Sequence, residues 1–239
     1  MGIVDCEGKT PRQINIAIKS LIAGGETDIR VRHPAAHHNL AVALTVPVHV
    51  IFEGSVGYYC GGMGDGPRIE VQGSAGWGLA EGMMSGTVMV EKNAGNGAAA
   101  AIRGGTVVVR GDVSARAGIS MKGGTVIVGG NVGYMTGFMM QKGTIIILGD
   151  AGAALGDSLY EGRIFIAGRI SELGNDAVVG TLNGDDERHL RADEVASPEC
   201  GFERRFAVGD RVDVSGVRSH RFKEGAWPPR SRRPGTRAE

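Results

Sequence analysis

Residues 106–124 read TVVVRGDVSARAGISMKGG, and residues 125–143 read TVIVGGNVGYMTGFMMQKG. The two stretches align without a gap, and blocks with the same pattern begin at residues 49, 68, 87, 106, 125, 144 and 163. Seven consecutive 19-residue blocks therefore cover residues 49–181. A fixed period of this length is typical of a solenoid, in which each repeat forms one coil and buries its apolar face against the next coil.

The second to fourth positions of each block are apolar or nearly so, as in Val107-Val108-Val109 and Ile145-Ile146-Ile147. Such β-branched runs predict short strands. A strand this short cannot pair within its own coil, so it pairs with the equivalent strand one coil away, about 4.8 Å distant, and all the ladders are parallel. The sequence therefore predicts an all-β fold, a right-handed parallel β-helix of about seven coils.

Glycine recurs at the sixth and ninth block positions, where the chain must turn, and glycine makes up 41 of the 239 residues. Glycine supplies positive φ at turns and lets neighbouring backbones approach closely. We therefore interpret these residues as structural turn glycines: Gly54, Gly57, Gly73, Gly76, Gly111, Gly130, Gly133, Gly149 and Gly152.

Large apolar residues recur at the sixteenth position and would stack above one another in register. The predicted interior ladder consists of Met83, Ile102, Met121, Met140 and Leu159. Eight of the nine methionines fall within the repeat, which is compatible with a methionine-rich partner surface, but a gap-filling core is the preferred interpretation.

Two segments flank the repeat. Residues 1–48 are expected to cap the N-terminal end. Thr10-Pro11 predicts a helix over about residues 11–23, and one or two strands are expected at 27–32 and 40–46. Residues 182–239 form a charged C-terminal extension, expected to be partly disordered unless bound. Its end could contact an acidic partner through Arg230, Arg232 and Arg233.

Composition excludes several classes of function. Lys plus Arg and Asp plus Glu are equal at 26 each, so neither nucleic acid nor a membrane is expected as a partner. The N-terminus lacks the pattern of a secretory leader, and no apolar run is long enough to span a membrane, so a cytoplasmic location is expected. Cys6, Cys60 and Cys200 have no cluster-ligand spacing, and no helix follows the glycine runs to form a nucleotide site. We therefore expect no cofactor in this chain.

Metal and catalytic chemistry are also not expected. His33 and His37 have helical ligand spacing and His38 follows, but Pro34 weakens that geometry and no acidic or cysteine ligand is expected nearby. Apart from His49, residues 49–181 contain no histidine to serve as a catalytic base. The outward positions are expected to be mostly small residues and glycine, which disfavours a carbohydrate-active β-helix.

The recurring strand, glycine and turn pattern resembles the glycine-repeat (GXGXG) β-helix domain at the C-terminal end of the glutamate synthase large subunit. It is most similar to the stand-alone subunit of N-methylglutamate synthase complexes. The resemblance covers roughly residues 10–181, and the segments that carry it are Gly54–Cys60, Glu81–Gly86, Gly118–Gly123, Gly149–Gly152 and Gly156–Glu161.

The resemblance implies a non-catalytic scaffold that joins an amidotransferase-like subunit to a subunit carrying FMN and an iron–sulfur cluster. The implied complex converts methylamine and glutamate to N-methylglutamate and ammonia. Two alternatives remain: the glycine-repeat subunit of a formylmethanofuran dehydrogenase or formyltransferase/hydrolase complex, and an independent binding β-helix. Candidate partner contacts are Tyr58, Tyr59, Asp157, Tyr160 and Glu161.

If the cofactors belong to partner subunits, the purified chain alone should be colourless and inactive. We expect no visible absorption from flavin or an iron–sulfur cluster, and no amidotransferase or transferase activity. An absorption spectrum of the isolated chain tests this, with the same spectrum after denaturation as a control for released flavin. A stoichiometric flavin signal would contradict the interpretation.

Overall fold

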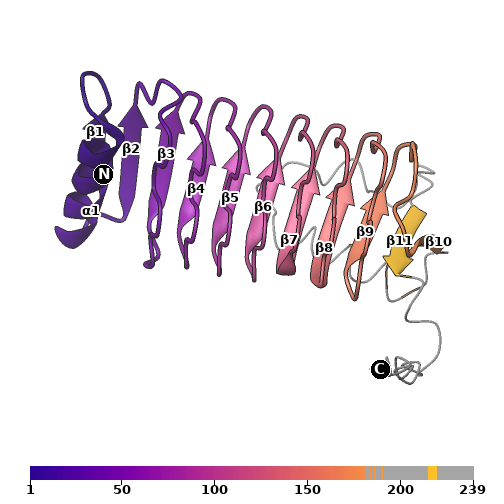
Figure 1. The fold of residues 1–239 in the computed structure, drawn as a ribbon. Helices are drawn as coiled ribbons and strands as arrows, with labels where there is room; N and C mark the ends of the chain where they lie inside the picture. Colours follow the sequence, from indigo (N-terminus) through magenta and orange to yellow (C-terminus); the bar gives the residue numbers. More distant parts are fainter. Residues whose placement is uncertain (181–183, 185, 187–189, 191–214, 220–239) are drawn as a thin grey trace, which may run out of the picture.

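The computed structural model describes residues 1–180, 184, 186, 190 and 215–219. Eleven strands form one sheet in the order β1-β2-β3-β4-β5-β6-β7-β8-β9-β11-β10 (Figure 1). The strands are β1 (Gly2–Asp5), β2 (Asp28–Arg32), β3 (His49–Glu53), β4 (Arg68–Val71), β5 (Thr87–Val90), β6 (Thr106–Val109), β7 (Lys122–Val128), β8 (Lys142–Ile147), β9 (Arg163–Ile166), β10 (Ala177–Gly180) and β11 (Ser215–Ser219).

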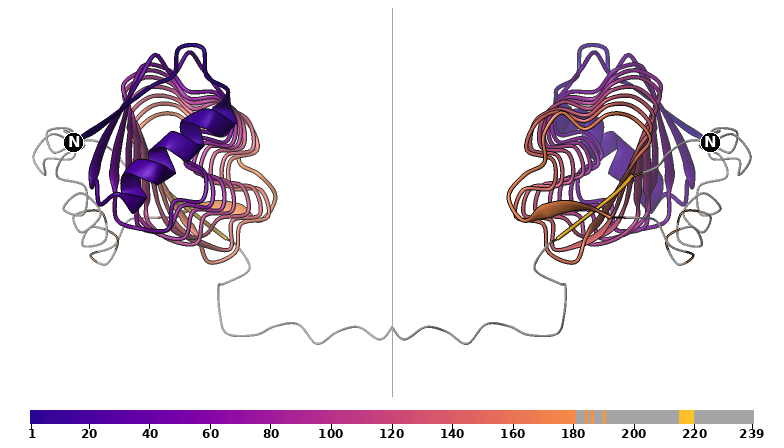
Figure 2. Two further views of the ribbon diagram at one scale, coloured as in Figure 1. Left: turned by 90° about the vertical axis from the view of Figure 1, so that its left-hand side faces the viewer. Right: turned by 90° about the vertical axis from the view of Figure 1, so that its right-hand side faces the viewer.

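Strands β1 to β9 are parallel, and from β3 to β9 the residue that begins each block pairs with its equivalent in the next block, as Thr106 does with Thr125. A second column of single bridges joins the eighth block positions, for example Val113 to Val132. The coils follow one another as a right-handed solenoid (Figure 2). The predicted right-handed parallel β-helix is confirmed.

The parallel ladder begins earlier than residue 49. β2 pairs with β3 through Asp28 and His49, and β1 pairs with β2 through Gly2 and Ile29. The strand expected at 40–46 is wrong, because this segment consists of turns. Its amides bond across to the next coil as later turn segments do, with Ala43 N donating to Gly62 O at 2.9 Å.

Helix α1 (Pro11–Ala23) lies across the N-terminal opening of the solenoid (Figure 2). A capping box starts it: Thr10 N donates to Gln13 Oε1 at 2.9 Å, and Gln13 N donates to Thr10 Oγ1 at 3.4 Å. Ile14 and Ile18 are fully buried. Because an open solenoid end would expose the core, this helix replaces the missing preceding coil. No helix in the described part of the chain is long and apolar enough to cross a membrane.

The interior is filled by columns of like residues. The sixteenth-position residues Met83, Ile102, Met121 and Met140 are fully buried, and Leu159 is nearly so. In strands β2 to β9 the residues on either side of the central one, such as Val107 and Val109, belong to this same core.

The central residue of each strand points to the opposite face of the sheet, since side chains alternate along a strand. From β5 to β9 these central residues form a separate apolar cluster, the outer stripe, in which no member is more than 5% exposed and against which Leu190 packs. The expectation that outward positions are mostly small residues and glycine is therefore wrong for this wall. The outer stripe consists of Met89, Val108, Ile127, Ile146 and Phe165.

Most of the predicted turn glycines allow the backbones of neighbouring coils to approach closely and do not adopt a positive φ. Among the nine predicted ones, only Gly54 has a positive φ, of 147°. A Cβ on Gly130 would overlap Asp112 Oδ1 and the backbone of Gly111 in the preceding coil, and a Cβ on Gly73 would overlap the backbone of Ser55. Even an alanine at these positions would push two coils apart.

A ladder of side chains runs beside these glycines at the seventh block position. Asn93 Oδ1 accepts from Asp112 N at 2.9 Å, Asp112 Oδ1 from Asn131 N at 2.7 Å, and Asn131 Oδ1 from Asp150 N at 2.8 Å. Each such bond contributes about 0.5–1.5 kcal/mol to stability. The ladder therefore holds successive turns in register.

The methionines allow a matched test of the core. Met121→Ala should lower the free energy of unfolding by about 2–5 kcal/mol, because it leaves a cavity in a fully buried column. Met84→Ala, at a side chain that is 47% exposed, should change it by less than about 0.5 kcal/mol. Urea unfolding followed by circular dichroism measures both, and equal losses would contradict the assigned interior.

Candidate docking surface

The wall away from the strands is built from consecutive tight turns, here called the ribbon, at block positions ten to seventeen. In the block that begins at residue 125, φ is positive at Met135 (58°), Gly137 (72°) and Met139 (53°). Phe138 N donates to Met135 O at 3.2 Å and Met140 N to Gly137 O at 3.1 Å, which closes the turns.

Bonds between coils fix each ribbon to its neighbours. Met135 N donates to Ala153 O in the following coil at 2.9 Å, and Gly137 N donates to Ala117 O in the preceding coil at 2.8 Å. Glycine, alanine, serine and methionine recur at the left-handed positions of the other coils. The ribbon is therefore an ordered surface, with its side chains held at fixed positions.

Large apolar side chains are exposed on this wall. Within residues 49–176, every large apolar residue that is exposed lies on the ribbon, and each is between 42% and 57% exposed. A gathering of this kind is typical of a protein interaction site. We call it the ribbon face; its members are Tyr58, Met63, Trp77, Met84, Tyr134, Met139 and Tyr160.

The ribbon face has two patches. The proximal patch comprises Tyr58, Met63, Trp77 and Met84, and the distal patch comprises Tyr134, Met139 and Tyr160. Residues 85–133, all of them described, expose no large apolar side chain.

An aromatic stack organises the proximal patch. The rings of Tyr58 and Trp77 lie 5.2 Å apart at 13°, and those of His38 and Tyr58 lie 4.4 Å apart at 20°. Tyr58 N also donates to His38 Nδ1 at 2.9 Å. Stacked rings lose little conformational freedom on binding, so they are suited to anchor a partner.

The predicted partner-contact residues differ in their exposure to solvent. Tyr58, Tyr160 and Glu161 are exposed, whereas Tyr59 is half-buried with its ring against Gly62. Asp157 is half-buried and accepts hydrogen bonds from Ser158 Oγ at 2.9 Å and Asn175 Nδ2 at 3.0 Å, so its carboxylate holds the last coil. The predicted contacts Arg230, Arg232 and Arg233 lie outside the described residues.

Sequence reasoning missed Trp77 and Tyr134, although both occupy the tenth block position, as Tyr58 does. It also missed Met63 and Met139, which share the fifteenth position. The recurrence of these residues at equivalent block positions is visible in the aligned sequence. The sequence alone, however, does not show which methionines of the ribbon point outward and which point into the core.

The buried thiols are poor nucleophiles. Burial raises the pKa of Cys60 to about 12, and burial likewise raises the pKa of Cys6. Neither thiol reaches solvent, since Cys60 is fully buried and Cys6 is 1% exposed.

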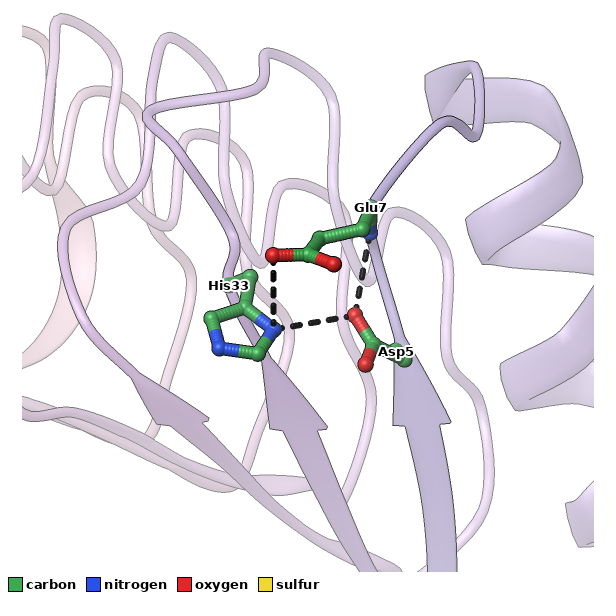
Figure 3. Close-up of side chains that lie close together, drawn as sticks. All are labelled: Asp5, Glu7 and His33. Atoms are coloured by element: carbon green, nitrogen blue, oxygen red, sulfur yellow. Dashed lines mark hydrogen bonds and ion pairs between the residues drawn. The ribbon is translucent and has the colours of Figure 1, made fainter.

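Asp5, Glu7 and His33 come together at the ends of β1 and β2 (Figure 3). His33 Nδ1 lies 3.0 Å from Asp5 Oδ1 and 3.8 Å from Glu7 Oε1, so the expectation that no acidic group lies near this histidine is wrong. The ligand atoms lie within 4.8 Å of one another, a spacing that a metal ion could bridge. All three side chains are exposed, however, and the ion pair accounts for their arrangement without a cation. His37, the expected helical partner of His33, is not in the cluster.

Hydrogen bonds shift the titration of this cluster. The Glu7 amide and then His33 lower the pKa of Asp5, and the hydrogen bond and charge of Asp5 raise the pKa of His33. The pair is therefore favoured while His33 is protonated, and it is lost as the pH rises through the raised pKa.

Replacing the carboxylate gives a direct check. In Asp5→Asn the pKa of His33 should fall toward its ordinary value, because the variant removes the charge that raises it. NMR titration of the histidine ring carbons in both proteins measures this change. An unchanged His33 pKa in the variant would show that the pair does not form in solution.

Comparison with known proteins places the chain in a family. A family model described as GXGXG motif matches residues 9–190. Protein GlxC of Rhizobium meliloti (strain 1021) is 41% identical over 91 residues, which are 38% of this chain and 40% of GlxC. The chain thus matches less than half the length of that relative. Because the family model covers most of the 239 residues, including every coil, the chain belongs to the GXGXG motif family.

Proposed function

We propose that this chain is a non-catalytic scaffold subunit of a cytoplasmic glutamate-synthase-like flavoenzyme complex, specifically N-methylglutamate synthase. It docks an amidotransferase-like subunit and a subunit that carries FMN and an iron–sulfur cluster, and it helps to wall the path of ammonia between them. The complex converts methylamine and glutamate to N-methylglutamate and ammonia.

The observation that carries the proposal is the ribbon face on a stiff rod. Seven half-exposed apolar side chains are held on turns that are hydrogen-bonded to both neighbouring coils, and this is the form expected of a surface that meets another protein. Membership of the GXGXG motif family supports the subunit role, and the segments that resemble the stand-alone glutamate-synthase-like subunit support the particular complex.

Side-chain chemistry supports a role without catalysis. The Cys60 thiol is buried with a raised pKa, and the Asp157 carboxylate is occupied by Ser158 and Asn175. The Asn/Asp ladder beside the turn glycines is likewise occupied by backbone amides of successive coils. These groups therefore hold the rod together.

Co-expression with candidate partner subunits tests the function. The chain should co-purify with a flavoprotein and an amidotransferase-like chain, and the complex should form N-methylglutamate from methylamine and glutamate. Co-purification with a molybdenum or tungsten hydrolase-type enzyme would overturn the proposal in favour of the formylmethanofuran dehydrogenase alternative.

Matched surface variants test the docking role. Trp77→Ser and Tyr134→Ser should each weaken assembly by about tenfold or more, as expected for aromatic anchors at an interface. Ile16→Ser, at a side chain that is 54% exposed on α1, should leave assembly unchanged. Analytical ultracentrifugation of the reconstituted complex measures the affinities, and equal effects of all three substitutions would contradict the assigned face.

A further inference from the structure

Three cations form a row along one edge of the ribbon face. Lys122 and Lys142 are paired directly, at the starts of β7 and β8, and Arg103 precedes Lys122 by one 19-residue coil. Lys122 N donates to Ile102 O at 2.8 Å, so the step between these coils is fixed. All three side chains are exposed, and none of their cationic groups forms an ion pair or hydrogen bond with the described residues.

Several other charges of the rod are paired between coils. Arg30 Nη1 lies 2.8 Å from Glu53 Oε1, Arg110 Nε lies 3.0 Å from Glu91 Oε2, and Arg169 Nη2 lies 2.9 Å from Asp150 Oδ2. Like charges on directly paired strand residues destabilise a sheet, and the fixed register prevents them from moving apart. The described coils supply the row with no such counter-charge.

The row lies between the two apolar patches. Arg103 follows Met84 by one 19-residue coil, so the row adjoins the proximal patch. Lys142 precedes Glu161 by one coil, and Glu161 is next to Tyr160 of the distal patch. A partner that spans Met84 and Tyr160 therefore also meets the cations.

We infer that the row of Arg103, Lys122 and Lys142 binds an acidic polypeptide segment of the partner that docks on the ribbon face. This inference rests on the proposed function and specifies the partner: its contact surface is acidic in the middle and apolar at both sides. The row advances about 4.8 Å per coil, close to the roughly 5–6 Å between residues i and i+4 of a helix. A helix with carboxylates on one face matches this spacing. Apolar side chains on the same helix can also contact the two patches, whereas a nucleic acid offers no apolar side chains to these patches.

A peptide probe tests the inference on the full chain. A labelled synthetic helix with glutamates at every fourth position should bind, and the same helix with glutamines should bind about tenfold more weakly. Raising the salt concentration should weaken the first interaction and leave the second unchanged, because salt screens exposed charges. Equal binding of the two helices, or displacement by polyphosphate in preference to the acidic helix, would overturn the inference.

Charge reversal then locates the site. The triple variant Arg103→Glu, Lys122→Glu and Lys142→Glu should lose at least about tenfold in affinity for the glutamate helix. The control triple Arg12→Glu, Lys19→Glu and Lys92→Glu makes the same change in net charge at exposed positions outside the row, and should lose less than about threefold. Fluorescence anisotropy measures both, and circular dichroism verifies that both are folded. Equal losses would show attraction by net charge alone and would overturn the inference.

Assembly with the partner subunits separates this inference from the proposed function. If the flavoprotein complex forms and the row variant assembles as tightly as the unaltered chain, the inference is wrong and the proposed function stands. If the unaltered chain does not assemble with the flavoprotein, but binds the acidic helix through the row, the proposed function fails and the inference stands.

Discussion

The register between neighbouring coils is the constraint on which this structure depends. From β3 to β9 each strand pairs with its equivalent in the next 19-residue block, and hydrogen bonds of the ribbon join the same coils at the opposite wall. Because each coil repeats the path of the preceding coil, residues at the same block position stack on one another, and these residues are similar in type. Interior columns, touching glycines and the Asn/Asp ladder all follow from this repetition.

The same constraint divides the outside of the rod into surfaces with different chemistry. The sheet wall carries the outer stripe, which is already buried, with Leu190 of this chain packed against it and Asp186 Oδ1 lying 3.7 Å from Arg163 Nη1. The ribbon wall carries apolar side chains that stay exposed. We therefore expect a partner at the ribbon wall, where the apolar side chains remain exposed.

Much of the fold could be predicted because the structural repeat of a solenoid appears as a repeat of the same length in its sequence. The strand residues such as Val107 and Val109 repeat without a gap, and this is sufficient to assign the coils. Prediction was weaker where the period changes. Gly2 pairs with Ile29, and Asp28 pairs with His49, so the first two steps are longer than the later ones and do not match the repeat.

The other errors of prediction concerned contacts between residues that are distant in sequence and the directions in which side chains point. Asp5 and His33 meet only because β1 and β2 are adjacent, so their 28-residue separation hid the ion pair. A strand of three apolar residues, such as Val107-Val108-Val109, does not reveal that the face on which its central side chain lies is also buried. The partner-contact residues remain predictions, since contacts with another protein leave no trace in a single chain beyond exposed surface.

Helix α1 has a further consequence, since it closes one end of the rod, and β11 runs antiparallel to β9 at the other. In the described residues neither end offers the continuing parallel coil that another rod would need in order to stack on it. The distance between the two patches is therefore set by the number of coils between them. Gain or loss of one repeat would change the separation of the proximal and distal patches in a step of about 4.8 Å, without disturbing the core.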